Sequence, residues 1–247
     1  MLSDIHGNLE ALEACLEAAP KHDRVFNLGD IVGYGANPNE VTDLARTLGS
    51  VFVRGNHDKA CTGLISLDDF NPVAGLAALW TRDQLTPDNL SFLRDLPAGP
   101  VTPIENLHCV HGSPRDEEEY VFLAREAYSI LGQAPVPLTF FGHTHVQGAY
   151  WIDDVKETEG VIDPKYPSPQ GKQQFPLALE KTAAYLINPG SVGQPRDGDP
   201  RAAFALYDTE AASVTFHRVP YDIKSAQKKI LSARLPDRLA TRLAEGR

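Results

Sequence analysis

The chain has 247 residues, of which 42% are hydrophobic, and a formal net charge of -10. These numbers predict a globular protein with a sizeable core, and the acidic charge argues against stable binding to nucleic acid or to an anionic membrane, because both need broad basic surfaces. A small substrate that carries phosphate is not excluded, since bound metal ions reverse the charge locally.

A strand, a polar loop and a helix alternate along the first part of the chain. Asn8 and Asn39 stand where they can cap helices, and Pro20 ends the first of these helices. Only Met1 and Leu2 precede the first polar motif, so either the first strand is very short or residues upstream are missing from this sequence. The elements predicted here are helices over 8–19 and 40–48 and strands over 25–30 and 50–54.

The middle of the chain continues the same alternation. Asn71-Pro72 and Thr86-Pro87 are helix-start signals within a stretch, 68–96, that is predicted to be helical. The elements predicted after it are strands over 107–112, 136–141 and 146–152 and a helix over 125–131. Together with the first part, this pattern predicts an α/β fold with its functional groups at the C-terminal ends of the strands.

The last part of the chain is predicted to be richer in strands. The segment 153–180 is the least periodic, and we interpret it as a long irregular excursion, with a hairpin as one form, rather than as a linker. Strands are expected over 182–187, 202–207 and 213–218, followed by a basic, amphipathic helical tail within 221–247 that is broken at Pro236. We expect residues 1–247 to form a single domain.

Polar side chains follow five of the apolar, strand-like runs. In an extended segment Asp4 and His6 point the same way, because they are two residues apart. A carboxylate and an imidazole that converge are suited to a divalent transition metal. The full set of candidate ligands is Asp4, His6, Asp30, Asn56, His111, His143 and His145.

Seven ligands are too many for one tetrahedral zinc site. They suit two metal ions about 3.5–4 Å apart that share one carboxylate. Asp30 is the expected bridge, because its strand lies between the two flanking ligand loops. Two divalent ions would outweigh the charges of Asp4, Asp30 and a bridging hydroxide, so the site would stay positive and select an anion such as a phosphate ester.

Of the eight histidines, four are candidate ligands, His57 adjoins the candidate ligand Asn56, and the other three are assigned other places. His22 is expected on the surface, at a turn between a helix and a strand. His108 lies three residues before His111, so on a strand the two face opposite ways, and His108 is expected in the core or behind the ligands. His217 falls outside the ligand set.

These motifs, from Asp4-x-His6 through Gly55-Asn56-His57-Asp58 to Gly142-His143-x-His145, resemble those of the calcineurin-like metallophosphoesterases. Within that superfamily, 33–35, 111–115 and 188–193 are similar to segments of the small prokaryotic phosphodiesterases of the YfcE type, some of whose relatives cleave diadenosine tetraphosphate. The resemblance implies a four-layer fold, in which two packed mixed β-sheets are flanked by α-helices.

The resemblance also implies roles for the ligands and their neighbours. One metal would take Asp4, His6, Asp30 and His145, and the other Asp30, Asn56, His111 and His143. A metal-bridging hydroxide would attack phosphorus in line, with His57 stabilising or protonating the leaving oxygen. Asp58 either orients His57 as a further catalytic residue or caps the following helix.

Other residues near the motifs have two readings each. Arg115 is a candidate for binding substrate phosphate together with Asn56, or it forms a surface ion pair, and for Arg54 the ion pair is favoured. The turn-rich segment 188–193 is interpreted as architecture at the edge of a sheet and as a candidate lining of the cleft. The basic residues of the tail are interpreted as a solvated helix face rather than a nucleic-acid contact.

The leading hypothesis is therefore a metal-dependent phosphoesterase of the phosphodiesterase type, with two divalent ions drawn from Mn, Fe, Zn, Co or Ni. The alternatives are a nucleotide pyrophosphatase of the diadenosine tetraphosphatase kind, a phosphomonoesterase at the same site, and a non-catalytic, metal-bound scaffold. The expected partner is a small phosphate ester, with no membrane contact, and a homo-oligomer stays open.

The cysteines indicate the compartment. The chain has an odd number of cysteines, which are widely spaced and form no C-x-x-C pair: Cys15, Cys61 and Cys109. We therefore expect reduced, mostly buried thiols in a cytoplasmic protein. We expect no membrane span, because no apolar stretch is long enough, and we expect no signal peptide, because nothing at the start of this sequence resembles one.

Overall fold

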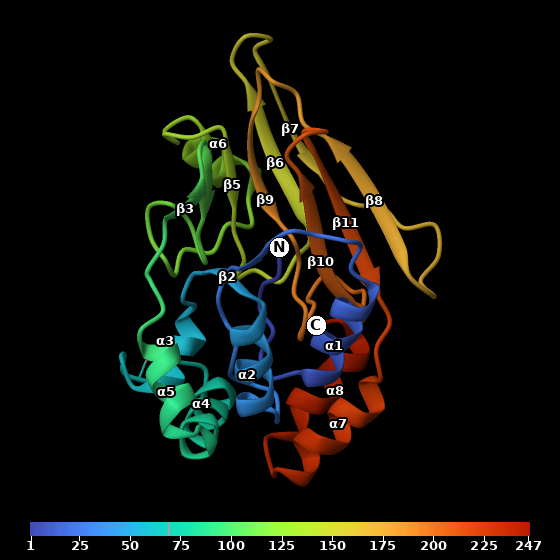
Figure 1. Cartoon of the computed structure of the whole chain (residues 1–247). Helices are drawn as coiled ribbons and strands as arrows, with labels where there is room; N and C mark the ends of the chain where they lie inside the picture. The colour runs from blue at the N-terminus through green and yellow to red at the C-terminus, as the bar shows by residue number, and fades with distance from the viewer. Residues whose placement is uncertain (69) are drawn as a thin grey trace.

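The structure is a computed structural model of the chain and describes residues 1–68 and 70–247. Most helices gather at one end of the molecule and most strands at the other (Figure 1). In the described part the helices are α1 (Leu9–Ala18), α2 (Pro38–Leu48), α3 (Asn56–Thr62), α4 (Pro72–Gln84), α5 (Pro87–Arg94), α6 (Ala124–Leu131), α7 (Ile223–Ser232) and α8 (Asp237–Glu245).

The strands fall into two layers that are built from distant parts of the chain. In the described part they are β1 (Val25–Asn27), β2 (Gly49–Phe52), β3 (Val101–Ile104), β4 (Leu107–Cys109), β5 (Leu138–Phe140), β6 (Gly148–Asp153), β7 (Thr158–Ile162), β8 (Gln173–Ala178), β9 (Ala184–Asn188), β10 (Ala202–Asp208) and β11 (Ser213–Val219).

The start of the chain joins the parts of the first layer. β1 and β2 are parallel, and Leu2 forms a parallel bridge to Asn27 at the end of β1. On its other side Met1 exchanges two hydrogen bonds with the main chain of Ala205 in β10. β10, β11 and β8 then follow as an antiparallel ladder. The start of the chain thus links β1 to β10 through the contacts of Met1 and Leu2.

The second layer is a mixed sheet with the order β3-β4-β5-β9-β6-β7. β4, β5 and β9 are parallel to one another, and β3, β6 and β7 pair antiparallel with their neighbours. The parallel strands deliver their C-terminal ends to the same edge, which is where the predicted ligand loops begin.

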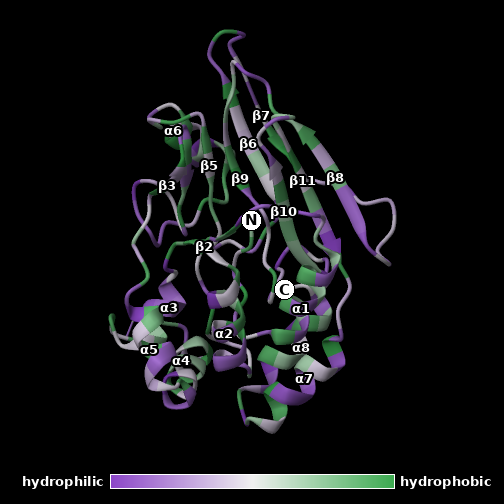
Figure 2. Ribbon diagram, in the orientation of Figure 1, coloured by the Kyte–Doolittle hydropathy of each residue, from purple (hydrophilic) through white to green (hydrophobic). Residues whose placement is uncertain are grey.

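Apolar side chains from both layers meet in one cluster, which includes the buried residues Phe26, Phe140 and Phe216. Figure 2 shows hydrophobic stretches along the strands and alternating polar and apolar positions along the helices. α6 packs on the outer side of the second sheet through Ala127 and Ile130, and α1 and α2 cover the first layer. The predicted fold class, two mixed sheets flanked by helices, is confirmed.

Several predicted elements need correction. α2 begins with Pro38 at its first position, and the Asn39 side chain instead bonds the main chain at Gln84 and Thr86. The predicted helical stretch 68–96 is not continuous but consists of α4 and α5, which begin at the two expected signals with Asn71 and Thr86 as N-caps, and its position 69 lies outside the described residues. The strand β3 was not predicted.

The segment 153–180 is less irregular than expected. It contains β7, which pairs with β6 as a hairpin, and β8, which adds to the edge of the other sheet beside β11. The excursion therefore crosses from one layer to the other. Its pairing partner β11 is far away in sequence, which explains why local periodicity did not reveal β8.

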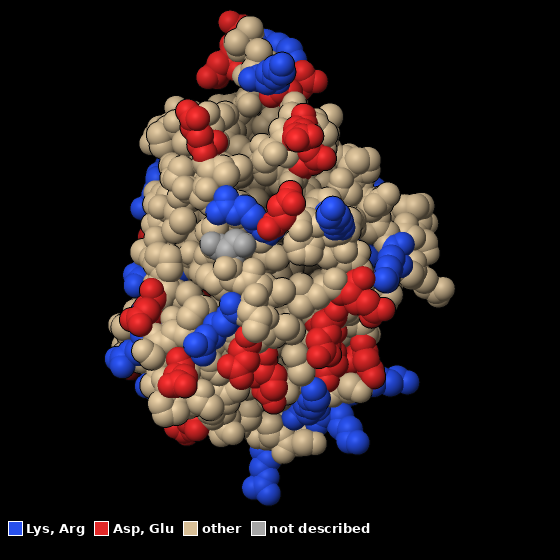
Figure 3. Space-filling model, viewed as in Figure 1, with Lys and Arg blue, Asp and Glu red and all other residues tan. Residues whose placement is uncertain are grey.

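The C-terminal helices pack rather than lie free. α7 and α8, which are separated near Pro236 as predicted, bury Ile230, Leu239 and Leu243 in a cluster that also includes Ala77 and the ring of Tyr34. Acidic side chains form several groups on the face in Figure 3, and the basic ones are dispersed among them. In the part of the chain that the structure describes, no helix has the length and apolar character needed to cross a membrane.

Candidate metal centre

The candidate ligands stand in strained loops that follow the strands. Five of them have φ between 48° and 66°, a left-handed conformation that non-glycine residues rarely adopt. Such strain persists only where surrounding contacts enforce it, and it concentrates at functional sites. The five residues are Asp4, His6, Asp30, His143 and His145.

Two glycines let these loops approach one another. A Cβ on Gly55 would stand 2.0 Å from Oδ1 of Asp30, and one on Gly142 would stand 2.0 Å from Oγ of Ser3. Ser3 Oγ in turn donates a hydrogen bond to Asp4 Oδ2 at 2.6 Å. Only glycine permits this packing of backbone against carboxylate, which explains these glycines in the two motifs.

The first group of ligands consists of Asp4, His6, Asp30 and His145, all buried, with potential ligand atoms within 4.8 Å of one another. His6 Nε2 lies 3.5 Å from Asp30 Oδ2, and His145 Nε2 lies 3.4 Å from Asp4 Oδ1. The residues come from three separate loops, since Asp4 and His6 share one, and the two sheets bring these loops to one place.

The second group consists of Asp30, His111 and His143, again within 4.8 Å of one another. His111 Nε2 lies 3.4 Å from Asp30 Oδ2 and 3.2 Å from Oδ1 of Asn56, the first residue of α3. The structure thus brings all seven predicted ligands together, and Asp30 belongs to both groups.

Main-chain carbonyls fix the imidazole rings from behind. Nδ1 of His6 lies 3.2 Å from the oxygen of Val32, and Nδ1 of His145 lies 2.6 Å from that of Gln194. Nδ1 of His111 likewise lies 2.8 Å from the oxygen of Leu28. A carbonyl accepts only, so each Nδ1 carries a proton and each Nε2 faces the centre, where it can bind a metal once it holds no proton. His143 is turned over, because its Nε2 lies 3.1 Å from the oxygen of Glu118.

This arrangement fits divalent cations. Buried imidazole nitrogens and two buried carboxylates, all of which can supply lone pairs to a metal, lie with their potential ligand atoms within 4.8 Å of one another in each group. A cation satisfies them, and carboxylate with imidazole is a ligand set typical of Zn, Mn, Fe, Co or Ni. The clusters are therefore able to hold metal.

Burial dominates the titration of the centre without metal. Burial raises the pKa of Asp4 to about 7. Burial acts the same way on Asp30, but the charges of His111 and His57 and a hydrogen bond to His111 together outweigh it and hold the pKa of Asp30 well below its usual value. Burial alone would lower the pKa of His111, but the charge of Asp30, the hydrogen bond to Asp30 and the charge of Asp4 together raise it to about 9. Metal binding therefore has to displace protons, which makes affinity dependent on pH.

His57 lies at the edge of the centre. It is buried, its ring centroid is 4.9 Å from that of His6, and its Nδ1 has no hydrogen-bond partner. Its main-chain N–H donates to Asp30 Oδ1 at 2.8 Å. Burial lowers the pKa of His57 to about 4, so the ring is neutral in the metal-free protein.

Asp58 corrects one expectation. Its carboxylate accepts hydrogen bonds from the main-chain N–H groups of Gly55, Asp30 and Ile31, each at 2.9 Å, and from Val32 at 3.3 Å. No hydrogen bond joins it to His57 Nδ1. Asp58 thus anchors the start of α3, which is the capping role, one of the two alternatives that the sequence left open. It also anchors the loop of Asp30.

The two predicted arginines both contact acids. Arg54 binds Glu117 through two hydrogen bonds of 3.0 Å. The guanidinium of Arg115 is 39% exposed, lies 3.9 Å from Glu119 and donates to Ser129 Oγ at 3.3 Å. Contact of Arg115 with substrate stays a prediction.

The other predicted positions are also located. His22 is exposed, and His108 is half-buried on β4 with no partner for Nδ1. His217 is buried and stacks on Phe204. The turn 188–193 reaches the centre, because Gly193 N donates to the main-chain oxygen of Asp4 at 3.0 Å.

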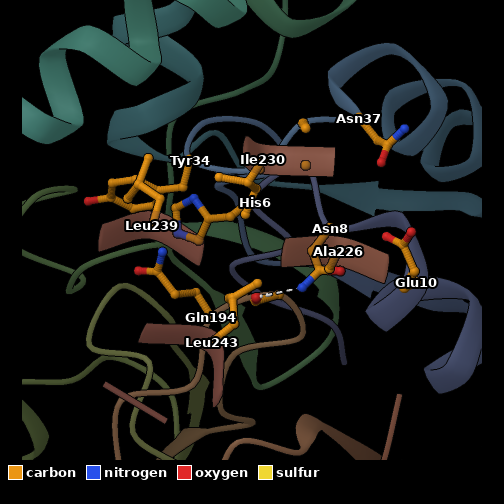
Figure 4. A pocket seen from close by; sticks show the side chains of 14 residues that line it. His6, Asn8, Glu10, Tyr34, Asn37, Gln194, Ala226, Ile230, Leu239 and Leu243 are labelled. Atoms are coloured by element: carbon orange, nitrogen blue, oxygen red, sulfur yellow. Dashed lines mark hydrogen bonds between the residues drawn. The ribbon is translucent and has the colours of Figure 1, made fainter. Parts of the chain in front are cut away.

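Sequence reasoning missed three side chains around the centre, those of Tyr34, Gln194 and Arg196. The ring centroid of Tyr34 lies 4.7 Å from that of His6 and 4.3 Å from that of His57. Figure 4 shows Tyr34 and Gln194 beside His6, with Leu239 of α8 against them. The flanking glycines marked Tyr34 as a turn, but no local signal marked Gln194 or Arg196, because only the fold brings them here.

Comparisons with known proteins agree with this geometry. A family model described as the calcineurin-like phosphoesterase superfamily domain matches residues 1–212. An uncharacterized protein of Methanocaldococcus jannaschii is 39% identical over 251 residues, covering 100% of this chain and 97% of that protein. The crystal structure of a metallophosphoesterase from Sphaerobacter thermophilus is 43% identical, with a TM-score of 0.85, and the match covers 100% of this chain and 97% of the other.

A hypothetical protein from Pyrococcus horikoshii shares the fold at 21% identity, with a TM-score of 0.75 and coverage of 100% of this chain and 97% of that one.

Proposed function

This chain belongs to the calcineurin-like phosphoesterase superfamily, and we propose that it hydrolyses a phosphodiester at a centre that holds two divalent metal ions. The observation that carries the proposal is the sharing of Asp30 by two buried ligand groups, each with its potential ligand atoms within 4.8 Å of one another. One ion would be held by Asp4, His6, Asp30 and His145. The other would be held by Asp30, Asn56, His111 and His143.

The bound ions would supply Lewis acids that lower the pKa of a water molecule and stabilise charge on the phosphoryl oxygens. The protein supplies rigidity. Main-chain carbonyls fix the rings of His6, His111 and His145, and the amides held by Asp58 fix Asp30. A centre that does not reorganise during the reaction stabilises the transition state better than mobile ligands do.

His57 is proposed to act on the leaving oxygen. In hydrolysis the water oxygen bonds to phosphorus, the bond from phosphorus to the leaving oxygen breaks, and one water proton ends on the leaving alcohol. His57 is neutral in its buried site, so the ring can donate a hydrogen bond to that oxygen. Negative charge on a bound phosphate would raise the pKa of His57 and favour full proton transfer.

An exposed aromatic pair next to the second group favours an ester with an organic arm. The ring of Tyr120 stacks on that of His143 with a centroid distance of 3.7 Å, and Phe122 stacks on Tyr120 at 5.5 Å. The two aromatic residues are 46% and 54% exposed. Such a surface suits the apolar or flat organic group of a diester. Inorganic phosphate has no such group and would leave the rings uncovered.

Metal analysis and a rate comparison test the proposal. The protein, stripped with a chelator and reloaded with manganese, is expected to hold two ions per chain and to hydrolyse bis(p-nitrophenyl) phosphate faster than p-nitrophenyl phosphate. A faster rate on the monoester would assign a phosphomonoesterase. Two ions with no hydrolysis of either ester, or of a dinucleotide polyphosphate, would favour the scaffold.

A further inference from the structure

Arg196 is attached to the same loop that fixes one of the ligand rings. Its main-chain N–H donates to the oxygen of His145 at 3.1 Å, and its Nη2 donates to Oε1 of Gln194 at 3.0 Å. The main-chain oxygen of Gln194 lies 2.6 Å from Nδ1 of His145. The guanidinium is thereby tied to the position of a predicted metal ligand.

The charge of Arg196 has no acidic partner in the described part of the chain. Its side chain is partly buried, and its Nε is a buried donor without any hydrogen-bond partner. Three other arginines that are partly or fully buried do have an acidic partner: Arg54 with Glu117, Arg201 with Asp199, and Arg218 with Asp197. A partly desolvated cation that lacks a counter-charge is costly unless an anion joins it.

Two tyrosines hold this guanidinium across the centre. Its Cζ lies 5.9 Å from the ring centroid of Tyr34, which packs on His6 and His57 of the first side. On the second side Tyr120 stacks on His143. Arg196 reaches the hydroxyl groups of both tyrosines, on which it acts through its charge and a hydrogen bond. Arg196 therefore lies between residues that contact both ligand groups.

A second arginine makes this side of the centre more positive. Cζ of Arg242 in α8 lies 6.0 Å from the Tyr34 ring centroid, and its Nε donates to the main-chain oxygen of Arg247. Burial lowers the pKa of Arg242 to about 10, and the charge of Arg196 adds to this effect. The two arginine charges beside the Tyr34 ring repel each other, and an anion bound between them and the centre would offset this repulsion.

We propose that Arg196 binds a non-bridging oxygen of the substrate's phosphoryl group at the centre, with Tyr34, Tyr120 and Gln194 as its positioning residues. This inference rests on the proposed function for the identity of the anion. A guanidinium suits the task because its planar set of N–H groups matches phosphate oxygens and it stays charged when partly buried.

Binding of inorganic phosphate to the manganese-loaded protein tests the inference without turnover. By isothermal titration calorimetry, Arg196→Gln is expected to raise the dissociation constant about 10–100-fold, the typical loss of a charged hydrogen bond, and Arg196→Lys to raise it less. Metal content should stay at the wild-type value. Arg238→Gln is the matched control, because it removes the same charge from an exposed position on α8.

Steady-state kinetics add a second readout. Arg196→Gln should raise KM for the diester more than it lowers kcat. Unchanged phosphate affinity in a folded, metal-loaded Arg196→Gln protein would overturn the inference. If Arg196→Gln does not fold, Arg196→Lys is measured instead. Wild-type phosphate affinity in Arg196→Lys would show that the planar set of guanidinium N–H groups does not bind the phosphate, and would count against the inference. If the wild type hydrolyses no ester but Arg196→Gln still weakens phosphate binding, the proposed reaction fails and the anion site stands.

Discussion

The Nε2 atoms of His6 and His145 lie 3.0 Å apart, although 139 positions separate the two residues in the chain. Each ring has its Nδ1 against a main-chain carbonyl, so both Nε2 atoms present lone pairs. Two lone pairs at this distance repel unless a proton or a cation lies between them. The fold enforces this approach with left-handed backbone at both residues, which indicates a site organised for a ligand.

The shared position of Asp30 predicts that its loss weakens both metal sites at once. Asp30→Asn keeps the size of the side chain but removes the charge that faces His6 and His111. Loss of a residue that only supports a ligand typically costs about 10–100-fold in metal affinity, and loss of a shared ligand should cost at least that much. Metal analysis after dialysis is expected to show both ions depleted.

Asp43→Asn provides the control, because Asp43 is an exposed acid on α2 and the change in net charge is the same. If Asp30→Asn retained two ions per chain, Asp30 would not be the bridge. Loss of one ion alone would place Asp30 in a single site.

The position of His57 predicts a loss of activity without a loss of metal. His57→Ala removes a ring that lies beside the centre but outside the two ligand groups. General acid catalysis typically contributes about 10²–10⁴-fold to the rate, so kcat for the diester should fall within that range. His22→Ala, at an exposed turn, should leave kcat unchanged. Loss of both ions in His57→Ala would show that His57 is a ligand or supports one.

The sequence was sufficient for the fold class because its signals are local. Apolar runs that end in glycine and a polar side chain marked β1, β4 and β5, and Asn8 does cap α1 by accepting from Ala11 N. β8 was missed because its pairing is with β11, and nothing near it in sequence specifies that partner. The start of α2 was misplaced because Asn37 and Asn39 both precede helix-forming residues, and Pro38 decides between them.

For the centre, spacing and residue type led us to expect the seven residues that the structure brings together, and their role as ligands stays a prediction. Asp58 shows what spacing does not decide, because a residue next to His57 in sequence points its carboxylate at main-chain amides instead. Arg196 and Tyr34 were not predicted to be residues of the centre, because their position depends on packing between loops that lie far apart in the chain.

The four hydrogen bonds of Asp58 predict a large effect on stability. Asp58→Ala would leave the buried amides of Gly55, Asp30 and Ile31 unpaired, and each unpaired buried donor costs about 1–3 kcal/mol. We expect the free energy of unfolding to fall by about 3 kcal/mol or more, measured by urea denaturation. Asp58→Asn keeps one acceptor oxygen and should lose less. Equal stability of Asp58→Ala and the wild type would refute the anchoring role.

His217 predicts a dependence of stability on pH away from the centre. Burial on β11 lowers its pKa from 6.5 to about 4. Between those pH values the unfolded chain binds more protons than the folded protein, so the contribution of neutral His217 is complete above pH 6.5 and is lost as the pH falls towards 4.

His217→Phe keeps a ring against Phe204 and removes the titration. In chelator, so that metal release does not contribute, the variant should gain stability relative to the wild type on going from pH 8 to pH 4.5. The gain has a ceiling of about 1.4 kcal/mol per unit of pKa shift. An equal loss in both proteins would show that His217 is not buried in its neutral form.

The close approach of Gly193 to Ile5 predicts that a change from glycine to alanine lowers the free energy of unfolding at position 193, whereas the same change raises it at position 75. A Cβ on Gly193 would stand 1.8 Å from the main-chain oxygen of Ile5, beside the hydrogen bond that ties Gly193 to Asp4. Neither main chain can move without displacing Asp4, so Gly193→Ala should lower the free energy of unfolding by about 3 kcal/mol and weaken metal binding.

Gly75→Ala is the matched variant, because Gly75 lies inside α4 and a Cβ there would meet only Phe70 Cβ, at 3.9 Å. This change should raise the free energy of unfolding by about 0.5–1 kcal/mol. Thermal denaturation of both variants measures the contrast, and a Gly193→Ala protein as stable as Gly75→Ala would show that the approach of these two loops is not tight.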